Sequence, residues 1–493
     1  METKAKLSRQ MGLIAVIATG VSSMVGASIN VVPFMIHRRV PSIGPYVLWA
    51  FVFAAIPALF AGLAYAILSS AMPRAGGSYL YASRGLNPYL GFVASFSQWF
   101  GLSIVIGVIA YISIPFLRDI AYSAEFFWIS DFLDQPWIRV GLGLSLIWSF
   151  VYLNIKGIKA YTSLLIPMVI VIFCLGSIVI FSMLFFDSSD FLASLAAKKN
   201  TVHLIPPDPD LQWSVFLSAA AILFSSFIGF DAIAQTGSEA INPTRNLPLA
   251  ILLSIIGVGL FYLLFTASVY HIVPWSYVAE QALLKDITAP GLLSLVLPSG
   301  LDILILFGAA IALINDLPAM LLSVSRLMFA WAKDGIFPDR ITAIHTKNKT
   351  PYIALIVAGI ISSIGVLGSH FAGDFFLGID IMVTSMLVNF LLMCITVLTI
   401  KRRNPKLSKN IKILKNRSVQ LFVGWAGTFF LSGFLTIQLF KDLSSKVSAW
   451  YFHSTYVWLL VMGLASLVFL YKWVKLRKRQ GSIGDHFKTL PTE

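Results

Sequence analysis

Two short stretches of the chain share a pattern that could bind a charged solute through main-chain groups. Residues 22–28 read SSMVGAS and residues 225–231 read SSFIGFD: two serines, two apolar residues, a glycine, any residue and a polar residue. Glycine tolerates non-helical backbone, and serine hydroxyls can satisfy peptide groups that a helix break frees. Freed amides suit a carboxylate, and freed carbonyls suit an ammonium group. The pair therefore predicts a receptor for a zwitterion.

The two glycines of this pattern, Gly26 and Gly229, allow a second interpretation. Glycines spaced among small residues also let membrane helices pack closely, without any break. The location of the two stretches favours a break, because they lie in the first and sixth apolar segments of the chain. These segments would begin the two halves of a five-plus-five inverted repeat, in which the first helix of each half is broken near the bilayer midplane.

A single carboxylate, Asp316, interrupts another apolar segment, AALINDLPAMLLSVSR. A charged side chain at mid-membrane costs about 2.5–3.5 kcal/mol on insertion scales, and such residues usually face a cavity or a partner. A carboxylate in this position could bind a sodium ion or carry a proton. Our hypothesis is that Asp316 is the ion-coupling residue. The alternative is a structural hydrogen-bonding role beside Pro318, which frees a carbonyl in its own helix.

The elements that must position these residues are membrane-spanning helices. The chain has 493 residues, of which 58% are hydrophobic and 12% are charged, whereas soluble domains carry about 25% charged residues. Its apolar runs reach the roughly 20 residues that a helix needs to cross a bilayer. We therefore predict an all-α polytopic membrane protein of twelve transmembrane helices, and the length of the runs argues against a β-barrel.

The expected organisation has six parts. They are a cytoplasmic N-terminal tail (1–10), spans 1–5 as a first inverted repeat (11–186), spans 6–10 as a second (211–400), a basic cytoplasmic loop (401–417), spans 11–12 (418–475) and a basic cytoplasmic C-terminal tail (476–493). Most of the 36 Lys and Arg residues fall on the side of the termini. The positive-inside rule then places both termini in the cytoplasm of a cell-membrane protein.

The net charge of +14 is explained by this topology, so no nucleic-acid partner is expected. The basic segments could bind anionic membrane lipid or could simply orient the chain. The two cysteines, Cys174 and Cys394, lie inside predicted spans, and neither a metal-ligand spacing nor a Walker motif occurs. We therefore expect no enzyme activity and no cofactor, and transport would use an ion gradient.

Four segments resemble the amino acid–polyamine–organocation transporter superfamily. Residues 224–251, FSSFIGFDAIAQTGSEAINPTRNLPLAI, resemble its sixth span, which typically reads F-x-x-Y-x-G-F-[DE] and then EE-x-x-NP. The other three are VGASIN (25–30), PRAGGSYLYASRGLNPYLGF (73–92) and SRLMFAWAKDGIFPDRITAIHTKNKTPY (325–352). The resemblance implies a leucine-transporter-type fold with spans 1 and 6 broken. It also implies secondary active transport of amino acids, by symport or exchange, through alternating access. The alternative is a polyamine or organic-amine carrier.

The resemblance also implies roles for individual residues. The backbone expected around the substrate carboxylate belongs to Val25, Gly26, Ala27 and Ser28. The main-chain oxygens expected to accept hydrogen bonds from the ammonium belong to Ser225, Ser226 and Ile228, beside Gly229. The two aromatic residues implied are Phe224 at a thin gate and Phe230 in the side-chain pocket. The ion-coupling set is Asn315 and Asp316, where sodium-coupled relatives often have two hydroxyl residues, with Ser22 and Val25 of the first span.

The chain departs from the family pattern at three places. Asn30 replaces a phenylalanine and Ser28 replaces a glycine, which makes the expected pocket more polar. Residues 164–176 lack the lysine that proton-coupled bacterial members often carry, with Ile172 near its place. The coupling ion can therefore be H⁺ or Na⁺. The loop between spans 3 and 4 has no cysteine, so no disulfide-linked heavy chain is expected.

Four further charged residues have two interpretations each. Asp231 either balances a cationic substrate side chain or caps the N-terminus of the second half of span 6. Glu239 either pairs with Arg326 or Arg245 as an inner gate, or forms no functional pair. In the second interpretation Asn242 and Pro243 shape the loop and Arg245 only orients the chain. A membrane-bound enzyme would need clustered catalytic residues at one depth, and a channel would not need two broken helices. The sequence therefore favours a carrier.

Overall fold

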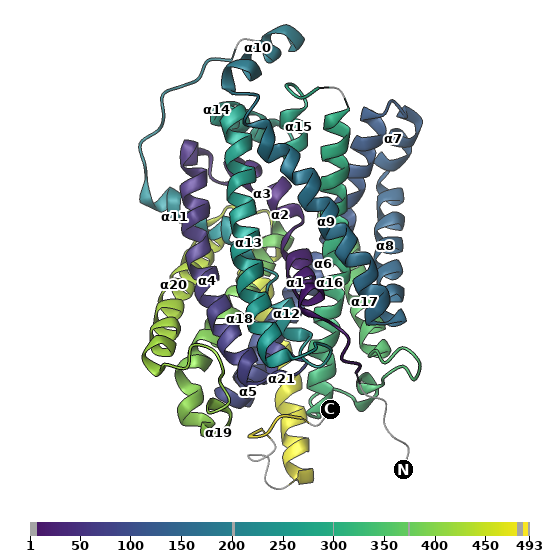
Figure 1. Cartoon of the computed structure of the whole chain (residues 1–493), viewed down its shortest axis with the longest axis vertical. Helices are drawn as coiled ribbons and strands as arrows, with labels where there is room; N and C mark the ends of the chain where they lie inside the picture. The colour runs from purple at the N-terminus through teal and green to yellow at the C-terminus, as the bar shows by residue number, and fades with distance from the viewer. Residues whose placement is uncertain (1–6, 200–202, 299, 373–374, 481–486, 492–493) are drawn as a thin grey trace.

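The computed structural model describes residues 7–199, 203–298, 300–372, 375–480 and 487–491. Figure 1 shows an elongated bundle of helices in which the chain enters and ends at the lower end. We call this the terminal end, and the opposite one the far end. Over the described residues, eleven helices are long and apolar enough to cross a membrane. With the broken first span they make twelve, which confirms the all-α polytopic architecture.

The spans follow the order of the apolar runs. The unbroken ones are α4 (Val47–Ala71), α6 (Pro88–Ser123), α8 (Pro136–Lys156), α9 (Ile158–Ser182), α13 (Pro243–Ile272), α16 (Leu301–Lys333), α17 (Tyr352–Ala372), α18 (Phe375–Arg403), α20 (Arg417–Ser444) and α21 (Ser454–Gln480). Local sequence sets several of their ends. The Asn87 side chain accepts the Tyr89 N–H at 2.8 Å and caps α6, and Gly157, with φ 113°, separates α8 from α9.

Short helices cover both ends of the bundle (Figure 1). Those at the far end are α7 (Phe127–Asp134), α10 (Ser188–Lys199), α14 (Trp275–Leu284) and α15 (Ala289–Leu293). Those at the terminal end include α5 (Gly77–Gly85) and α19 (Pro405–Ser408). Short 3-10 turns at Pro41–Tyr46, Asp339–Thr342 and Trp450–Phe452 complete the connections.

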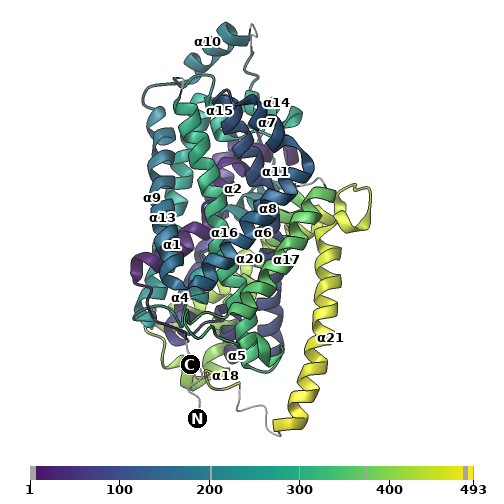
Figure 2. The ribbon, with the colours of Figure 1, turned by 90° about the vertical axis from the view of Figure 1, so that its right-hand side faces the viewer.

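The bundle has a buried centre and a lipid-exposed edge. In the most apolar stretches of α16 and α18, 72% and 78% of the residues are buried, against 17% in α21. Figure 2 shows α21 standing along one side of the molecule. The centre therefore consists of α6, α16 and α18 together with the broken spans. The helices of the rim shield this centre from lipid.

Spans 1 and 6 are both broken, as predicted. Span 1 consists of α1 (Leu13–Met24), α2 (Ala27–Asn30) and α3 (Val32–Arg39). Span 6 consists of α11 (Trp213–Leu223), the 3-10 turn η2 (Phe224–Phe227) and α12 (Ala232–Gln235). In span 6, 89% of the most apolar stretch is buried, and Met24 and Val25 at the break in span 1 are buried as well. Both breaks therefore lie inside the protein and away from lipid.

Candidate functional site

The break in span 1 falls at Val25 and Gly26, between α1 and α2. Val25 is extended, with φ −94° and ψ 92°, although its N–H still donates to the Val21 carbonyl at 2.8 Å. The Met24 carbonyl accepts a hydrogen bond from the Tyr262 hydroxyl of α13. A Cβ atom at Gly26 would overlap the carboxylate of Asp316. Only glycine therefore lets the span-8 carboxylate approach the span-1 backbone this closely.

The break in span 6 lies directly against the break in span 1. Ile228 is extended, with φ −74° and ψ 137°, and Gly229 has φ 132°, which L-residues rarely adopt. A Cβ atom at Gly229 would overlap the carbonyl oxygen of Ser23. The glycines of the repeated pattern therefore serve both interpretations, because they permit the breaks and also permit close packing.

A small cavity of about 40 Å³ lies between the two breaks, which is enough for bound water. Span 1 contributes Ser23 and Met24, span 6 contributes Ser225 and Ile228, and span 8 contributes Asp316. The aliphatic remainder of the lining is Val32, Val105, Val108, Ile109, Met320, Ile379 and Met382. The cavity thus combines polar groups at the breaks with an apolar wall from α6 and α18.

Asp316 is the one ionisable side chain among the described residues that line this cavity. The residue is 4% exposed, and its Oδ1 has no hydrogen-bond partner in the described part of the chain. A buried carboxylate without a partner is costly unless it binds a cation or a proton. The described residues include no group of three or more His, Cys, Asp or Glu, so any cation here would be held mainly by neutral oxygens beside Asp316.

The neighbour of Asp316 joins span 8 to span 1. The Asn315 Nδ2 donates to the Ser22 Oγ at 2.6 Å, while its own Oδ1 is buried without a partner. The structure therefore brings the four predicted ion-coupling residues to one place, since Val25 follows closely after Ser22 at the break. Oxygens of these residues could contact a cation beside Asp316.

Three serine hydroxyls at the breaks are also unsatisfied. The Oγ atoms of Ser23, Ser225 and Ser226 are buried and have no hydrogen-bond partner among the described residues. Most buried polar side chains in proteins are hydrogen-bonded. Two of them, Ser23 and Ser225, line the central cavity, which indicates a place where a polar solute or water completes the hydrogen bonding.

Asp231 points away from the cavity. One carboxylate oxygen accepts the Gly229 N–H at 3.1 Å, and the other accepts a hydrogen bond from the Gln98 side chain of α6. Asp231 precedes α12, but its side chain bonds no amide of that helix. The side chain therefore fixes the unwound segment against span 3, and neither a cap of α12 nor a charge facing the cavity is present.

The predicted pocket residues of span 6 and Asn30 lie elsewhere. Phe230 stacks on Phe390 with ring centroids 5.0 Å apart, and Phe224 contacts the same ring at 6.1 Å. Asn30 lines a separate apolar cavity of about 20 Å³ that also contains Ile172. Ala27 and Ser28 form the first turn of α2. The structure therefore groups the two breaks and Asp316 around the central cavity, whereas the described side chains of Phe224, Phe230 and Asn30 do not line it. The predicted positions of the Ala27 and Ser28 side chains lie outside the described part of the structure.

A buried ion pair lies at the terminal end. The Arg326 Nη2 lies 2.5 Å from the Glu239 Oε1, and its Nε donates to Oε2 at 3.2 Å. Both side chains are at most 1% exposed. Arg245 is exposed at the start of α13, so the structure selects Arg326 as the partner. The Glu239 carbonyl also accepts the N–H groups of Gln10 and Met11, at 2.9 and 3.0 Å.

Sequence reasoning missed three residues at the breaks. They are Ser23 in the cavity wall, Tyr262 on the Met24 carbonyl and Gln98 on the Asp231 carboxylate. Tyr262 and Gln98 are polar side chains within apolar spans, which is a usable signal because such side chains need a partner in the membrane. Nothing in the sequence identifies which groups they contact.

Comparison with known proteins agrees with this architecture. A family model described as amino acid permease matches residues 11–464. The branched-chain amino acid permease BcaP of Bacillus subtilis (strain 168) is 25% identical over 432 residues, which are 82% of this chain and 84% of that protein. The low-affinity putrescine importer PlaP of Escherichia coli (strain K12) is 22% identical over 397 residues, 79% and 78% of the two chains. The chain therefore belongs to the amino acid permease family of membrane transporters.

Proposed function

We propose that the protein carries neutral amino acids with aliphatic side chains across the cell membrane by alternating access. The single observation that carries this proposal is the composition of the central cavity. It joins buried serine hydroxyls without hydrogen-bond partners at two helix breaks to a wall of Val, Ile and Met side chains. The similarity to the branched-chain amino acid permease supports the same substrate class.

The two breaks would hold opposite ends of the zwitterion. The backbone of residues 25–28 would surround the carboxylate, and main-chain oxygens of Ser225, Ser226 and Ile228 would accept hydrogen bonds from the ammonium group. Freed amides and carbonyls at helix breaks suit these charges. The solute side chain would then lie against the aliphatic wall, and the cavity must widen from its present 40 Å³ to admit it.

Asp316 would couple solute binding to a cation. Its carboxylate contacts Gly26, at the place proposed for the substrate carboxylate. Two carboxylates about 4 Å apart repel by about 4 kcal/mol at an effective dielectric constant of about 20. A proton on Asp316, or a sodium ion held between Asp316, Asn315 and the span-1 backbone, removes this repulsion. Solute and cation would therefore bind together, which is the requirement for symport.

A polyamine is the second candidate substrate, and the similarity to the putrescine importer favours it. A diamine has an ammonium group at each end, and the cavity offers one carboxylate because Asp231 faces Gln98. The second ammonium would lie among aliphatic side chains without a partner, which is unfavourable. The amino acid is therefore the better fit.

The ion pair between Glu239 and Arg326 would act as the inner gate, with both termini in the cytoplasm. In this arrangement the terminal end of the bundle faces the cytoplasm, where the positive-inside rule places its Lys and Arg residues. The gate would have to separate before solute is released. Arg245 would contribute to orientation and to binding of anionic lipid.

Uptake into proteoliposomes tests the proposal. The purified protein is reconstituted, and uptake of labelled leucine is measured with sodium and pH gradients imposed one at a time. Unlabelled valine, isoleucine, lysine, glutamate and putrescine are added as competitors. We expect valine and isoleucine to compete and one of the two gradients to drive accumulation. Absence of leucine uptake, together with uptake of labelled putrescine into the same vesicles, would contradict the assignment.

A further inference from the structure

We propose that residues 487–491 form an internal latch that docks beside α5 and holds the terminal end of the transporter closed. The inference rests on the proposed alternating access, because it assigns to the latch a preference for one of the two conformations. Three observations carry it, together with a contact between the loop before α5 and the gate. They are the contacts of the docked segment, the ion pair beneath it, and the connection from α5 to the break in span 6.

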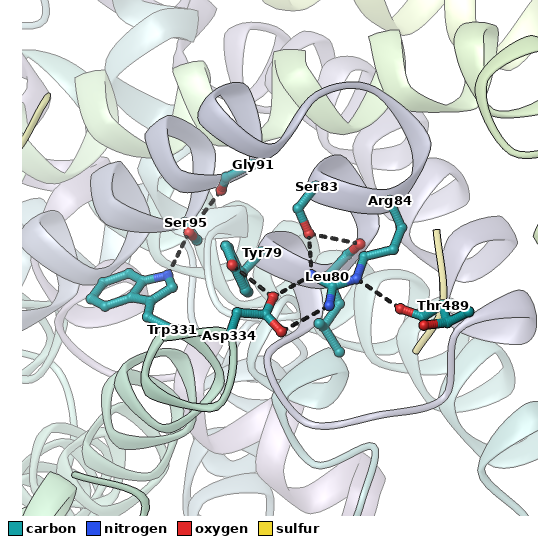
Figure 3. Close-up of polar contacts among 9 residues, drawn as sticks. All are labelled: Tyr79, Leu80, Ser83, Arg84, Gly91, Ser95, Trp331, Asp334 and Thr489. Carbon is teal, nitrogen blue, oxygen red and sulfur yellow. Dashed lines mark hydrogen bonds and ion pairs between the residues drawn. The ribbon is translucent and has the colours of Figure 1, made fainter. Parts of the chain in front are cut away.

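The segment 487–491 is held by side-chain and main-chain contacts. Phe487 is 5% exposed and lies under the guanidinium of Arg84, with 5.0 Å from the ring centroid to Cζ. The ring of Trp473 on α21 is 5.5 Å away from it. The Arg84 Nε donates to the Thr489 carbonyl at 3.2 Å (Figure 3), and the Asn404 Nδ2 donates to the Lys488 carbonyl at 3.0 Å. The segment is therefore docked at the terminal end against Arg84, Asn404 and Trp473.

The residue that binds this segment is itself anchored to span 8. Arg84 pairs with Asp334, which directly follows α16, at 2.5 and 2.9 Å, and both side chains are 1% exposed. The Tyr79 hydroxyl donates to the same carboxylate at 2.7 Å (Figure 3). Burial disfavours the charged guanidinium of Arg84 and lowers its pKa. The charge and hydrogen bonds of the neighbouring Asp334 outweigh this effect, so the pKa of Arg84 is raised. Arg84 is therefore a fixed cation that joins the latch to α16.

The other end of α5 reaches the break in span 6. The Ser78 Oγ donates to the Gln98 Oε1 at 2.5 Å, and Gln98 donates to Asp231, which holds the Gly229 N–H. A Cβ atom at Gly77 would lie 2.7 Å from the Gln235 side chain of α12. One short helix thus contacts the docked segment at one end; at the other end it contacts α12 directly and the unwound segment through Gln98.

The loop before α5 also touches the gate. The Ala75 N–H donates to the Ser238 Oγ at 2.9 Å, one residue before Glu239. Opening of the terminal end must separate Glu239 from Arg326, so it must also disturb the position of α5. A docked segment that holds α5 against α16 therefore favours the closed conformation. Release of the segment is expected to ease opening.

The test is Phe487→Ala in the full-length protein. Removing the buried ring is expected to shift the docking equilibrium by about 10- to 150-fold. We expect faster amide hydrogen exchange in residues 77–85 and 229–235, and a higher initial rate of solute exchange in proteoliposomes. Phe487→Trp should restore both values. Tyr471→Ala, an exposed aromatic position on the same helix that carries Trp473, is the matched control and should behave as wild type.

The outcomes separate the latch from the transport proposal. Unchanged amide exchange in residues 77–85 after Phe487→Ala shows that the segment does not hold α5, and it overturns the inference. Faster amide exchange with an unchanged or lower transport rate also overturns it, because α5 would then not limit opening. Hydrogen exchange needs no substrate, so failure of the proposed amino acid specificity leaves this readout intact.

Discussion

Replacing Gly229 by alanine is expected to destabilise the protein and to stop transport. The backbone there has φ 132°, and strain of this kind costs about 1–3 kcal/mol for an L-residue. The new Cβ would also overlap the Ser23 carbonyl oxygen. That group belongs to backbone and cannot rotate aside, so span 1 must move, which adds about 1–3 kcal/mol. The expected total is about 2–6 kcal/mol.

The assay pairs thermal unfolding in detergent with uptake in proteoliposomes. Gly257→Ala in α13 is the control, since nothing lies within 4 Å of a Cβ atom there. Alanine in place of a helical glycine should stabilise by about 0.5–1 kcal/mol, so the two variants should move the melting temperature in opposite directions. Uptake by Gly229→Ala should fall about tenfold for each 1.4 kcal/mol by which the substitution destabilises the binding conformation. Wild-type melting and wild-type uptake in Gly229→Ala would refute the reasoning.

Two other substitutions test how the site is held. Glu239→Gln leaves the Arg326 charge buried without its partner, which costs about 3–5 kcal/mol of the free energy of unfolding and should lower the melting temperature. Arg245→Gln on the exposed surface should leave the free energy of unfolding within about 0.5 kcal/mol of wild type. Tyr262→Phe removes the hydrogen-bond donor to the Met24 carbonyl. The loss of about 1–3 kcal/mol should appear as slower uptake. Wild-type uptake kinetics in this variant would mean that the hydrogen bond does not support the break.

The sequence was sufficient to predict the spans and the breaks, for identifiable reasons. Membrane spans are long apolar runs, because every main-chain polar group must be satisfied inside lipid. The breaks carry glycine at Gly26 and Gly229, where a side chain would overlap Asp316 or Ser23. The glycine shared by the two similar stretches, 22–28 and 225–231, therefore identifies the position of each break in the sequence.

Side-chain directions could not be predicted in the same way. Asp231 follows a break and precedes a short helix, a position that fits a cap, yet its carboxylate turns back to Gly229 and across to Gln98. Gln98 lies more than 100 residues away in sequence, and only the packing of α6 against span 6 brings it close. The docking of Phe487 beside Arg84 depends on tertiary packing in the same way, and no local sequence pattern predicts it.

The most direct test of the central claim is gradient-driven uptake by Asp316→Asn in proteoliposomes, measured beside counterflow of the same labelled solute. Asparagine has nearly the same shape and no charge, so the variant should bind solute without the coupling cation. We expect gradient-driven accumulation to disappear while counterflow persists. Accumulation at the wild-type rate, or loss of counterflow together with accumulation, would contradict the assignment of Asp316 as the residue that links the cation to the solute.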